Sequence, residues 1–307
     1  MNTKSTQTVK QFTEHYKLGN PFDLENNTSY HAWREHKLEN YPENIEDLII
    51  EIKNPKKLSN TEYTAIQQLL VKTNMVIYAS NTGSDTDKTI PVKLGEQFGL
   101  TELDNNMGAD DGITSLKVVT TQSHAGYIPY TNKAIHWHTD GYYNDLNNQI
   151  SSLLLHCVSP AENGGQNSLL DHEIAYIHLR DSNPDYIAAL MRNDVMSIPP
   201  NIENGKEIRP LRSGPVFSIM LDGNLHMRYT ARTRSIEWKK DFITQAAVKE
   251  LNEFTNSKSK HIYRATLQSG QGLISNNVLH DRSSFKESFS NKRLIYRLRY
   301  YQRIANT

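Results

Sequence analysis

The chain is poor in cysteine, in net charge and in long apolar runs. Cys157 is the only cysteine among 307 residues, which excludes an intrachain disulfide framework. The 34 basic and 34 acidic residues cancel, so no overall field attracts nucleic acid or an anionic membrane. No apolar run approaches the ~20 residues that a membrane span requires. We therefore expect neither nucleic acid nor a membrane as a partner.

The first residues, 1–7, also lack the apolar core of a secretory signal, so we expect a cytoplasmic protein. A content of 37% hydrophobic and 22% charged residues is ordinary for a globular enzyme, which favours a small-molecule substrate as the partner. The sequence does not set the oligomeric state, and a homo-oligomer stays open.

Composition divides the chain near residue 60. Residues 1–60 are polar and rich in Asn, Glu and Lys, so we expect an N-terminal extension packed on a main domain of residues 61–307. Ser59-Asn60-Thr61-Glu62 has the form of a capping box, and apolar residues then recur at helical spacing. This pattern predicts a helix of about three turns, followed by a strand over 74–78.

Strand patterns dominate the rest. Residues 116–120 and 150–158 read as strands, whereas residues 173–191 and 237–254 have helical patterns and are expected to buttress the strands. Residues 262–268 and 273–277 flank a Gly-rich turn and predict a hairpin. The fold class expected is mainly β with flanking helices.

The last strand, residues 293–301, has the clearest alternation in the chain. Leu294, Tyr296, Leu298 and Tyr300 lie on one face, and the other face carries arginines at 293, 297 and 299. If the Leu/Tyr face packs on helices, the arginine face looks inward, where an acidic ligand would offset the cost of burying guanidinium groups.

One short motif carries metal chemistry. His138 and Asp140 are two residues apart at the end of an apolar stretch, and His280 follows a second strand-like run. Two histidines and one carboxylate form a facial triad, which leaves positions open at a metal and is typical of non-haem Fe(II) sites rather than of structural zinc. His136 competes with His138, but its spacing to Asp140 is four residues, so we assign it to the pocket wall.

The order of these motifs resembles that of the taurine dioxygenase-like (TauD/TfdA) family of oxygenases. From about Tyr127 to Arg303 the chain has His138-x-Asp140, the pair Gly164-Gly165, the late His280 and then arginines. The resemblance implies a double-stranded β-helix (jelly roll), with Fe(II) bound by His138, Asp140 and His280. It further implies a dioxygenase that uses 2-oxoglutarate and O2, releases succinate and CO2, and hydroxylates a small substrate. The intact carboxylate of Asp140 favours oxygen insertion over halogenation.

The resemblance also implies the co-substrate residues. Arg293, thirteen residues after His280 (293 − 280), matches the arginine that binds the far carboxylate of 2-oxoglutarate. The family usually has a threonine after the Gly-Gly pair; here Asn167 takes that position, and its amide or the hydroxyl of Ser168 could supply the same hydrogen bond.

The substrate side is expected around Tyr142, Tyr143 and Asn144, which follow the metal aspartate, and around Arg297, one alternation beyond Arg293. The run Met227–Arg234 contains three basic residues, Arg228, Arg232 and Arg234. They either line the substrate entrance or are solvated, and we favour the interpretation that they are solvated. Together these cations indicate an anionic or amino-acid-like substrate.

Two alternatives remain. A non-catalytic jelly-roll binding protein would bind metal or ligand without releasing succinate. A cupin-like oxygenase that does not use 2-oxoglutarate would leave the arginine face of residues 293–299 unexplained.

Overall fold

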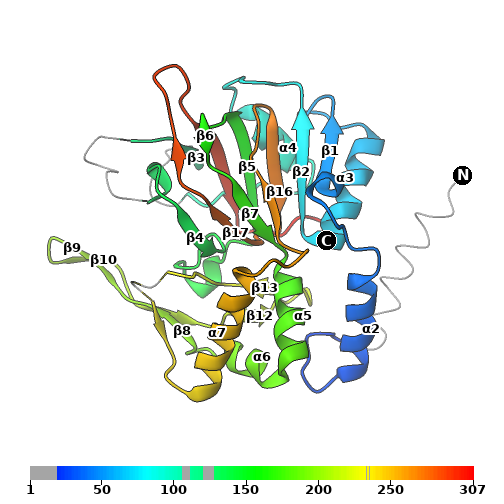
Figure 1. Ribbon diagram of the computed structural model, residues 1–307, viewed down its shortest axis with the longest axis vertical. Coiled ribbons are helices and arrows are strands. Elements are labelled where there is room, and N and C mark those ends of the chain that lie inside the picture. Colours follow the sequence, from blue (N-terminus) through cyan, green and yellow to red (C-terminus); the bar gives the residue numbers. More distant parts are fainter. Residues whose placement is uncertain (1–18, 106–110, 120–127, 233, 235) are drawn as a thin grey trace, which may run out of the picture.

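The computed structural model describes residues 19–105, 111–119, 128–232, 234 and 236–307. The molecule has two layers that differ in secondary structure (Figure 1). The upper layer holds the long strands with two helices on their outside. The lower layer holds three further helices and several short strands from one insertion between strands of the upper layer, with a helix of the N-terminal segment beside them.

The main sheet has six strands. Their spatial order is β1 (Ile49–Ile52), β2 (Met75–Ser80), β16 (Gln271–Ser275), β5 (Ser152–Ser159), β19 (Leu294–Tyr300) and β3 (Ile113–Leu116). Only the β1–β2 pair is parallel in this sheet. The central strand β5 is buried along almost its whole length, as its continuous apolar sequence predicts.

A four-stranded antiparallel sheet faces the main sheet. Its order is β15 (Tyr263–Ala265), β7 (Asn167–Leu170), β17 (Leu279–Arg282) and β4 (Ile135–His138). One buried cluster joins the inner faces of both sheets, with Leu155 and Leu273 on one side and Leu169 and Leu279 on the other. The molecule is therefore a double-stranded β-helix, which confirms the expected fold class.

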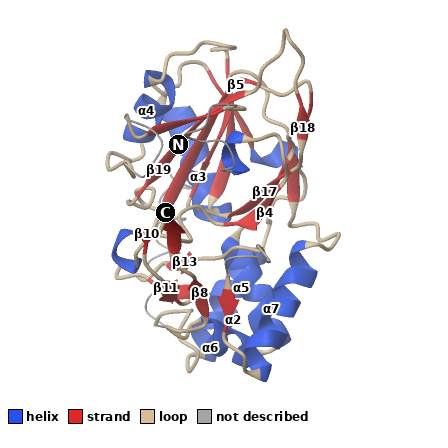
Figure 2. Cartoon of the chain, turned by 90° about the vertical axis from the view of Figure 1, so that its left-hand side faces the viewer, coloured by secondary structure: helices blue, strands red, loops and turns tan. Residues whose placement is uncertain are grey.

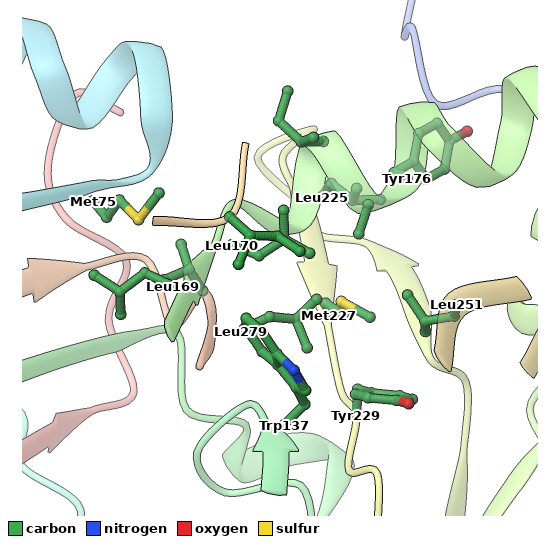
Figure 3. Close-up of a cluster of buried hydrophobic side chains, with 14 of the residues drawn as sticks. Met75, Trp137, Leu169, Leu170, Tyr176, Leu225, Met227, Tyr229, Leu251 and Leu279 are labelled. Atoms are coloured by element: carbon green, nitrogen blue, oxygen red, sulfur yellow. The ribbon is translucent and has the colours of Figure 1, made fainter. Parts of the chain in front are cut away.

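The same core continues into the lower layer. Figure 3 shows Trp137 of β4 between Leu279 of the barrel and Tyr229 of the insertion, with Met227 beside them. Trp137 is buried, as expected for a residue that alternates away from His138. Because this apolar contact is continuous, the strand that carries the histidine is braced from below.

The outer face of the main sheet is covered by α3 (Asn60–Thr73) and α4 (Thr89–Glu96). The capping box at Ser59 is present, with Glu62 bonded back to the backbone of Ser59, so the predicted helix start is confirmed. Leu298 and Tyr300 of β19 pack in one cluster with Ile66 of α3. The alternation predicted for the last strand is thus confirmed, and its arginines face the barrel interior.

The insertion contains α5 (His172–Ser182), α6 (Pro184–Leu190) and α7 (Phe242–Thr255). Its short strands are β8 (Met196–Ile198), β9 (Asn201–Glu203), β10 (Lys206–Arg209), β11 (Arg212–Gly214), β12 (Phe217–Ile219), β13 (Leu225–Met227) and β14 (Glu237–Trp238). The β9–β10 hairpin projects from the body of the molecule (Figure 1). Figure 2 shows α5, α6 and α7 gathered at the end of the molecule opposite β5. A further small pair joins β6 (Asn163–Gly164) to β18 (Phe285–Lys286).

The part of the N-terminal segment that is described, residues 19–60, runs along the side of both layers. It contains α2 (Asn27–Leu38), the 3-10 turn η2 (Ile45–Leu48) and β1, which extends the main sheet. Lys37 of α2 is buried and forms ion pairs with Asp171 and Glu173 at 2.7 and 2.5 Å. The expected extension of residues 1–60 includes residues 1–18, which lie outside the described residues.

Three predictions of local structure are wrong. Residues 262–277 form no hairpin, because β15 pairs with β7 while β16 pairs with β2 and β5, so the chain changes sheets at Gly270. The helix expected from Glu237 begins only after Asp241, because Glu237 and Trp238 pair with β8. The strand expected over 116–120 is β3, which ends at Leu116; Thr120 lies outside the described residues.

Two smaller expectations can also be compared with the structure. Cys157 is fully buried in β5, and burial raises the pKa of its thiol to about 12, which fits a packing role. In the described ranges, no helix has the length and apolar character needed to cross a bilayer.

Candidate metal and co-substrate site

The two predicted histidine ligands lie on neighbouring strands. His138 ends β4, His280 lies in β17, and the register of the two strands places them opposite each other. Their ring centroids are 4.3 Å apart. Asp140 follows β4 directly, and its Oδ2 lies 3.9 Å from Nε2 of His280. The fold therefore brings together three residues from two segments that are far apart in the chain.

Backbone carbonyls fix the orientation of both rings. Nδ1 of His138 lies 2.9 Å from the carbonyl oxygen of His136, and Nδ1 of His280 lies 2.9 Å from that of Val278. A carbonyl oxygen can only accept, so each Nδ1 carries a proton, and Nε2 is the ring nitrogen left to face a metal ion. Burial and the neighbouring His280 ring lower the pKa of His138 to about 3. His138 is thus held neutral, which is the form that binds a metal ion.

The carboxylate of Asp140 is buried and has two different sides. Oδ1 accepts a hydrogen bond from Nη1 of Arg297 at 3.0 Å. Oδ2, on the side of His280, is buried without a hydrogen-bond partner. Burial alone would raise the pKa of Asp140, but the guanidinium groups of Arg297 and Arg299 hold it well below its usual range. Asp140 is therefore an anion with one oxygen directed toward the histidines.

This donor set fits a divalent iron ion. Among the described residues, no three His, Cys, Asp or Glu side chains already converge on one metal position. Nε2 of His280 nevertheless lies 3.9 Å from the unpartnered Oδ2 of Asp140, and the ring of His138 lies 4.3 Å from that of His280. The three neighbouring side chains therefore match the two-histidine, one-carboxylate donor set.

Asn277 connects the two ligand-bearing segments. Its Oδ1 accepts from the backbone N–H of Asp140 at 2.8 Å, while its Nδ2 donates to the carbonyl oxygens of Asp140 and Ile150 at 2.9 and 2.7 Å. Asn277 has φ of 49°, a left-handed conformation that asparagine tolerates better than most residues. Sequence reasoning missed this residue; the only local signal is its place three residues before His280.

Arg299 belongs to the inward arginine face that the sequence predicts, although no separate role was expected for it. Its Nη2 is 2.7 Å from Oδ2 of Asp104, its Nη1 donates to the hydroxyl of Tyr143 at 2.7 Å, and Nη1 is 3.9 Å from Oδ1 of Asp140. Burial alone would lower the pKa of Arg299, but Tyr143 and the two carboxylates raise it above its ordinary value. Arg299 therefore supports Asp140 from the inward face of β19.

Arg293 lies in a small cavity of its own. The cavity is lined by Gly165, Asn167, Thr266 and Leu267, among others, and its arginine is buried with Nη1 lacking a hydrogen-bond partner. Burial lowers the pKa of Arg293 to about 10, so the side chain is still a cation at neutral pH. A buried cation with an unused donor is suited to a carboxylate that forms parallel hydrogen bonds with the guanidinium fork.

The position after the Gly-Gly pair places Asn167 beside Arg293. Asn167 also donates from Nδ2 to the carbonyl oxygen of Asp281, the residue after the predicted ligand His280, so the cavity adjoins β17. Ser168 does not line the cavity. It lies opposite Arg264 in the sheet and alternates to the other face of β7.

Of the residues expected on the substrate side, Tyr142 contacts one of the histidines directly. The ring of Tyr142 meets His138 edge-on, with centroids 6.5 Å apart, and Tyr143 packs edge-on against Tyr142 at 5.2 Å. The amide of Asn144 donates to the carbonyl of Asn148 at 3.0 Å and shapes the loop. Arg297 lies at Asp140, nearer to the metal ligands than to the surface.

The basic run Met227–Arg234 is not uniformly solvated. Arg228 is buried and donates to four carbonyl oxygens, those of Tyr142, Met196, Gly214 and Arg212. Arg232 is half-buried and donates from Nη1 to the hydroxyl of Tyr142 at 3.0 Å. Arg234 is exposed. The favoured interpretation of this cluster as a solvated surface is therefore wrong for Arg228 and Arg232.

A family model described as "Taurine catabolism dioxygenase TauD, TfdA family" matches residues 37–299. The chain belongs to the TauD, TfdA family. Two curated relatives are named uridine-5'-phosphate dioxygenase. The one from Streptomyces sp. is 30% identical over 176 residues, covering 55% of this chain and 62% of the relative. The one from Amycolatopsis sp. is 25% identical over 185 residues, covering 59% and 65%. The chain spans less than two thirds of the length of these relatives.

Solved structures share the TauD-like fold. AAD-2, in complex with Mn(II) and N-oxalylglycine, has a TM-score of 0.61 at 12% identity, with 83% of this chain and 94% of that chain covered. The non-heme iron oxygenase OrfP, in complex with Fe and alpha-ketoglutaric acid, has a TM-score of 0.59 at 14% identity over 80% and 81%. An asparagine oxygenase in complex with Fe(II), 3-hydroxyasparagine and succinate has 0.54 at 13% over 78% and 81%.

Proposed function

We propose that this protein is an Fe(II)- and 2-oxoglutarate-dependent dioxygenase that hydroxylates a small anionic molecule. The observation that carries the proposal is the pair of opposed histidines, His138 and His280, whose rings lie 4.3 Å apart, with Nε2 of His280 3.9 Å from the unpartnered Oδ2 of Asp140. Membership of the TauD, TfdA family supports the same chemistry.

The proposed roles divide between two neighbouring regions. His138, Asp140 and His280 would hold the iron. Arg293 would bind the far carboxylate of 2-oxoglutarate, since a buried guanidinium with an unused Nη1 lowers the cost of burying an anion. Asn167 lines the same cavity and would add a hydrogen bond. Iron, 2-oxoglutarate and O2 together would supply the oxidising power, with release of succinate and CO2 and transfer of one oxygen atom to a C–H bond of the substrate.

The chain's own residues would prepare the site. Asn277 holds the backbone of Asp140, and Arg299 holds its side chain from β19. Arg297 keeps Asp140 ionised and lies where a substrate anion could also reach it. Tyr142 and Tyr143 form an aromatic wall beside His138 on the substrate side, and Asn144 shapes their loop.

Uridine 5'-phosphate is the first substrate to test, because two relatives carry that name. The other expectations also stay proposals: a boundary near residue 60, a cytoplasmic location, and no nucleic-acid or membrane partner. The oligomeric state stays open. The cupin-like alternative is less favoured, because it gives the buried Arg293 no ligand.

The proposal is tested by succinate release from 2-oxoglutarate with Fe(II) and O2, with and without uridine 5'-phosphate. Wild-type protein should release succinate, and Arg293→Ala should require a much higher 2-oxoglutarate concentration. Arg264→Ala is the matched control, because Arg264 is exposed on β15 of the same sheet. Binding of iron and 2-oxoglutarate without any succinate would instead support the non-catalytic binding protein.

A further inference from the structure

A segment of the insertion lies directly against the strand that carries the metal ligand His138. Thr230 forms a β-bridge with His138, the N–H of Ala231 donates to the carbonyl of Trp137 at 2.8 Å, and the N–H of Thr139 donates to the carbonyl of Tyr229 at 3.0 Å. Bridge partners present their side chains on the same side, and residues two apart share a face. Arg228 and Arg232 therefore lie on the face of this segment that His138 also uses.

Arg232 reaches the aromatic wall of the site. Its Nη1 donates to the hydroxyl of Tyr142 at 3.0 Å, and the ring of Tyr142 meets His138 edge-on. One guanidinium group thus lies a single side chain away from a proposed iron ligand.

Arg209 approaches the same wall from the end of β10. Its Nη2 donates to the carbonyl of Pro199 at 2.8 Å, directly after β8, the strand whose Met196 carbonyl accepts from Arg228. The pKa of Arg209 is lowered, mainly by burial and also by the charge of Arg212. The phenols of Tyr142 and Tyr143 act in the other direction and raise it. Ile198, the residue before Pro199, lies opposite Arg212 of β11, and the carbonyl of Arg212 accepts from Arg228, so backbone contacts place Arg209 in the same part of the insertion as Arg228.

The charges of this wall do not balance. Arg212 is paired with Asp145 at 2.8 Å, and Arg299 with Asp104 at 2.7 Å. By contrast, no carboxylate of the described residues lies within ion-pair distance of the remaining three, which are Arg209, Arg228 and Arg232. Partly buried cations normally have a counter-charge. An anion of the substrate would supply it.

The three guanidinium groups have different capacities. Arg228 uses four of its five N–H groups on backbone carbonyls, which are neutral, so it contributes mainly charge. Arg209 and Arg232 are half-buried and keep N–H groups beyond the contacts described above. Arg297 is already engaged with Asp140, so the wall is better placed than Arg297 to bind an anion.

We propose that Arg209 and Arg232 form a binding subsite for a phosphate monoester group of the substrate, with Arg228 adding charge from behind. This inference rests on the proposed function, since it names the substrate class of that site. A phosphate monoester carries about −1.5 to −2 charges at neutral pH, which matches several uncompensated cations better than one carboxylate does. Guanidinium forks also bind its oxygens in pairs.

Binding is measured by calorimetry on the purified full chain, alone and with Fe(II) and 2-oxoglutarate under argon. The probes are uridine 5'-phosphate against uridine, and phenyl phosphate against phenol. Wild-type protein should bind at least one phosphate monoester about tenfold or more tightly than its alcohol, since hydrogen bonds to charged groups contribute at this level. If neither pair shows such a preference, the inference is wrong.

The Arg209→Gln/Arg232→Gln double variant should lose about tenfold or more of this preference, whereas Arg234→Gln, an exposed arginine of the same segment, should keep it. Should the double variant fail to fold, Arg232→Lys decides: it keeps the charge, loses the fork, and should bind the monoester several-fold more weakly. A preference unchanged in folded Arg209 and Arg232 variants would overturn the assignment.

The two proposals can fail separately. Succinate release without a phosphate preference would keep the oxygenase and refute the subsite. A phosphate preference that depends on Arg209 and Arg232, without succinate release, would keep the subsite and refute the oxygenase.

Discussion

Replacement of Asn277 by alanine should weaken both the fold and the metal site. Asn277→Ala removes three hydrogen bonds, to the N–H and carbonyl of Asp140 and to the carbonyl of Ile150. At about 1 kcal/mol for each bond, the loss is about 3 kcal/mol. Alanine is also strained at φ of 49°, which costs about 1 kcal/mol more. We expect a decrease of about 4 kcal/mol in the free energy of unfolding.

Two companion variants separate these contributions. Asn277→Gly keeps the left-handed backbone without strain, so its loss should be about 3 kcal/mol. Asn204→Ala changes another left-handed asparagine, exposed at the turn of β9–β10 and remote from the hydrogen bonds of Asp140; it should lose only about 1 kcal/mol.

Urea unfolding gives the stabilities, and Fe(II) titration gives the metal affinity. Because Asn277 fixes the backbone of a ligand, both Asn277 variants should bind Fe(II) about 10- to 100-fold more weakly, as is usual for residues that orient metal ligands. Asn204→Ala should bind it normally. If Asn277→Ala has the same stability and iron affinity as Asn204→Ala, then Asn277 does not hold Asp140 in place.

Three further outcomes are expected. Arg299→Gln should raise the pKa of Asp140 and weaken Fe(II) binding, which a titration of the variant with Fe(II) at several pH values would show. If the variant binds Fe(II) as tightly as the wild-type protein at every pH, Arg299 does not support Asp140. Burial lowers the pKa of His156 to about 4, so the unfolded state binds more protons and stability should fall by about 3 kcal/mol from pH 6.5 to 4; urea unfolding of wild type and His156→Asn should differ in this slope. The Cys157 thiol, with its pKa raised to about 12, should react with a thiol reagent only in urea, and rapid native labelling would exclude its burial.

The sequence was informative where function depends on short spacing. His138, Asp140 and His280 could be singled out because each stands at the end of an apolar strand pattern, and the fold brings them together. The inward arginine face of β19 followed from simple alternation. Such signals are local, or depend only on the period of a strand.

The sequence was uninformative where a side chain is defined by distant backbone. Arg228 resembled a solvated basic residue, yet carbonyls from four separate positions satisfy it. Asn277 acts on Asp140, far along the chain. The wrong hairpin has the same cause, because a Gly-rich turn does not specify whether the next strand pairs with its neighbour or crosses to the other sheet.

The most direct test of the iron and 2-oxoglutarate site is an anaerobic titration of the purified protein with Fe(II) and then 2-oxoglutarate, followed by visible absorption. We expect the wild-type protein to show the weak charge-transfer band of a 2-oxo acid chelated to iron. Asp140→Ala should lose the band, and Arg293→Ala should need a higher 2-oxoglutarate concentration to develop it. Iron binding with no band in the wild-type protein, or an unchanged band in Asp140→Ala, would contradict the proposed site.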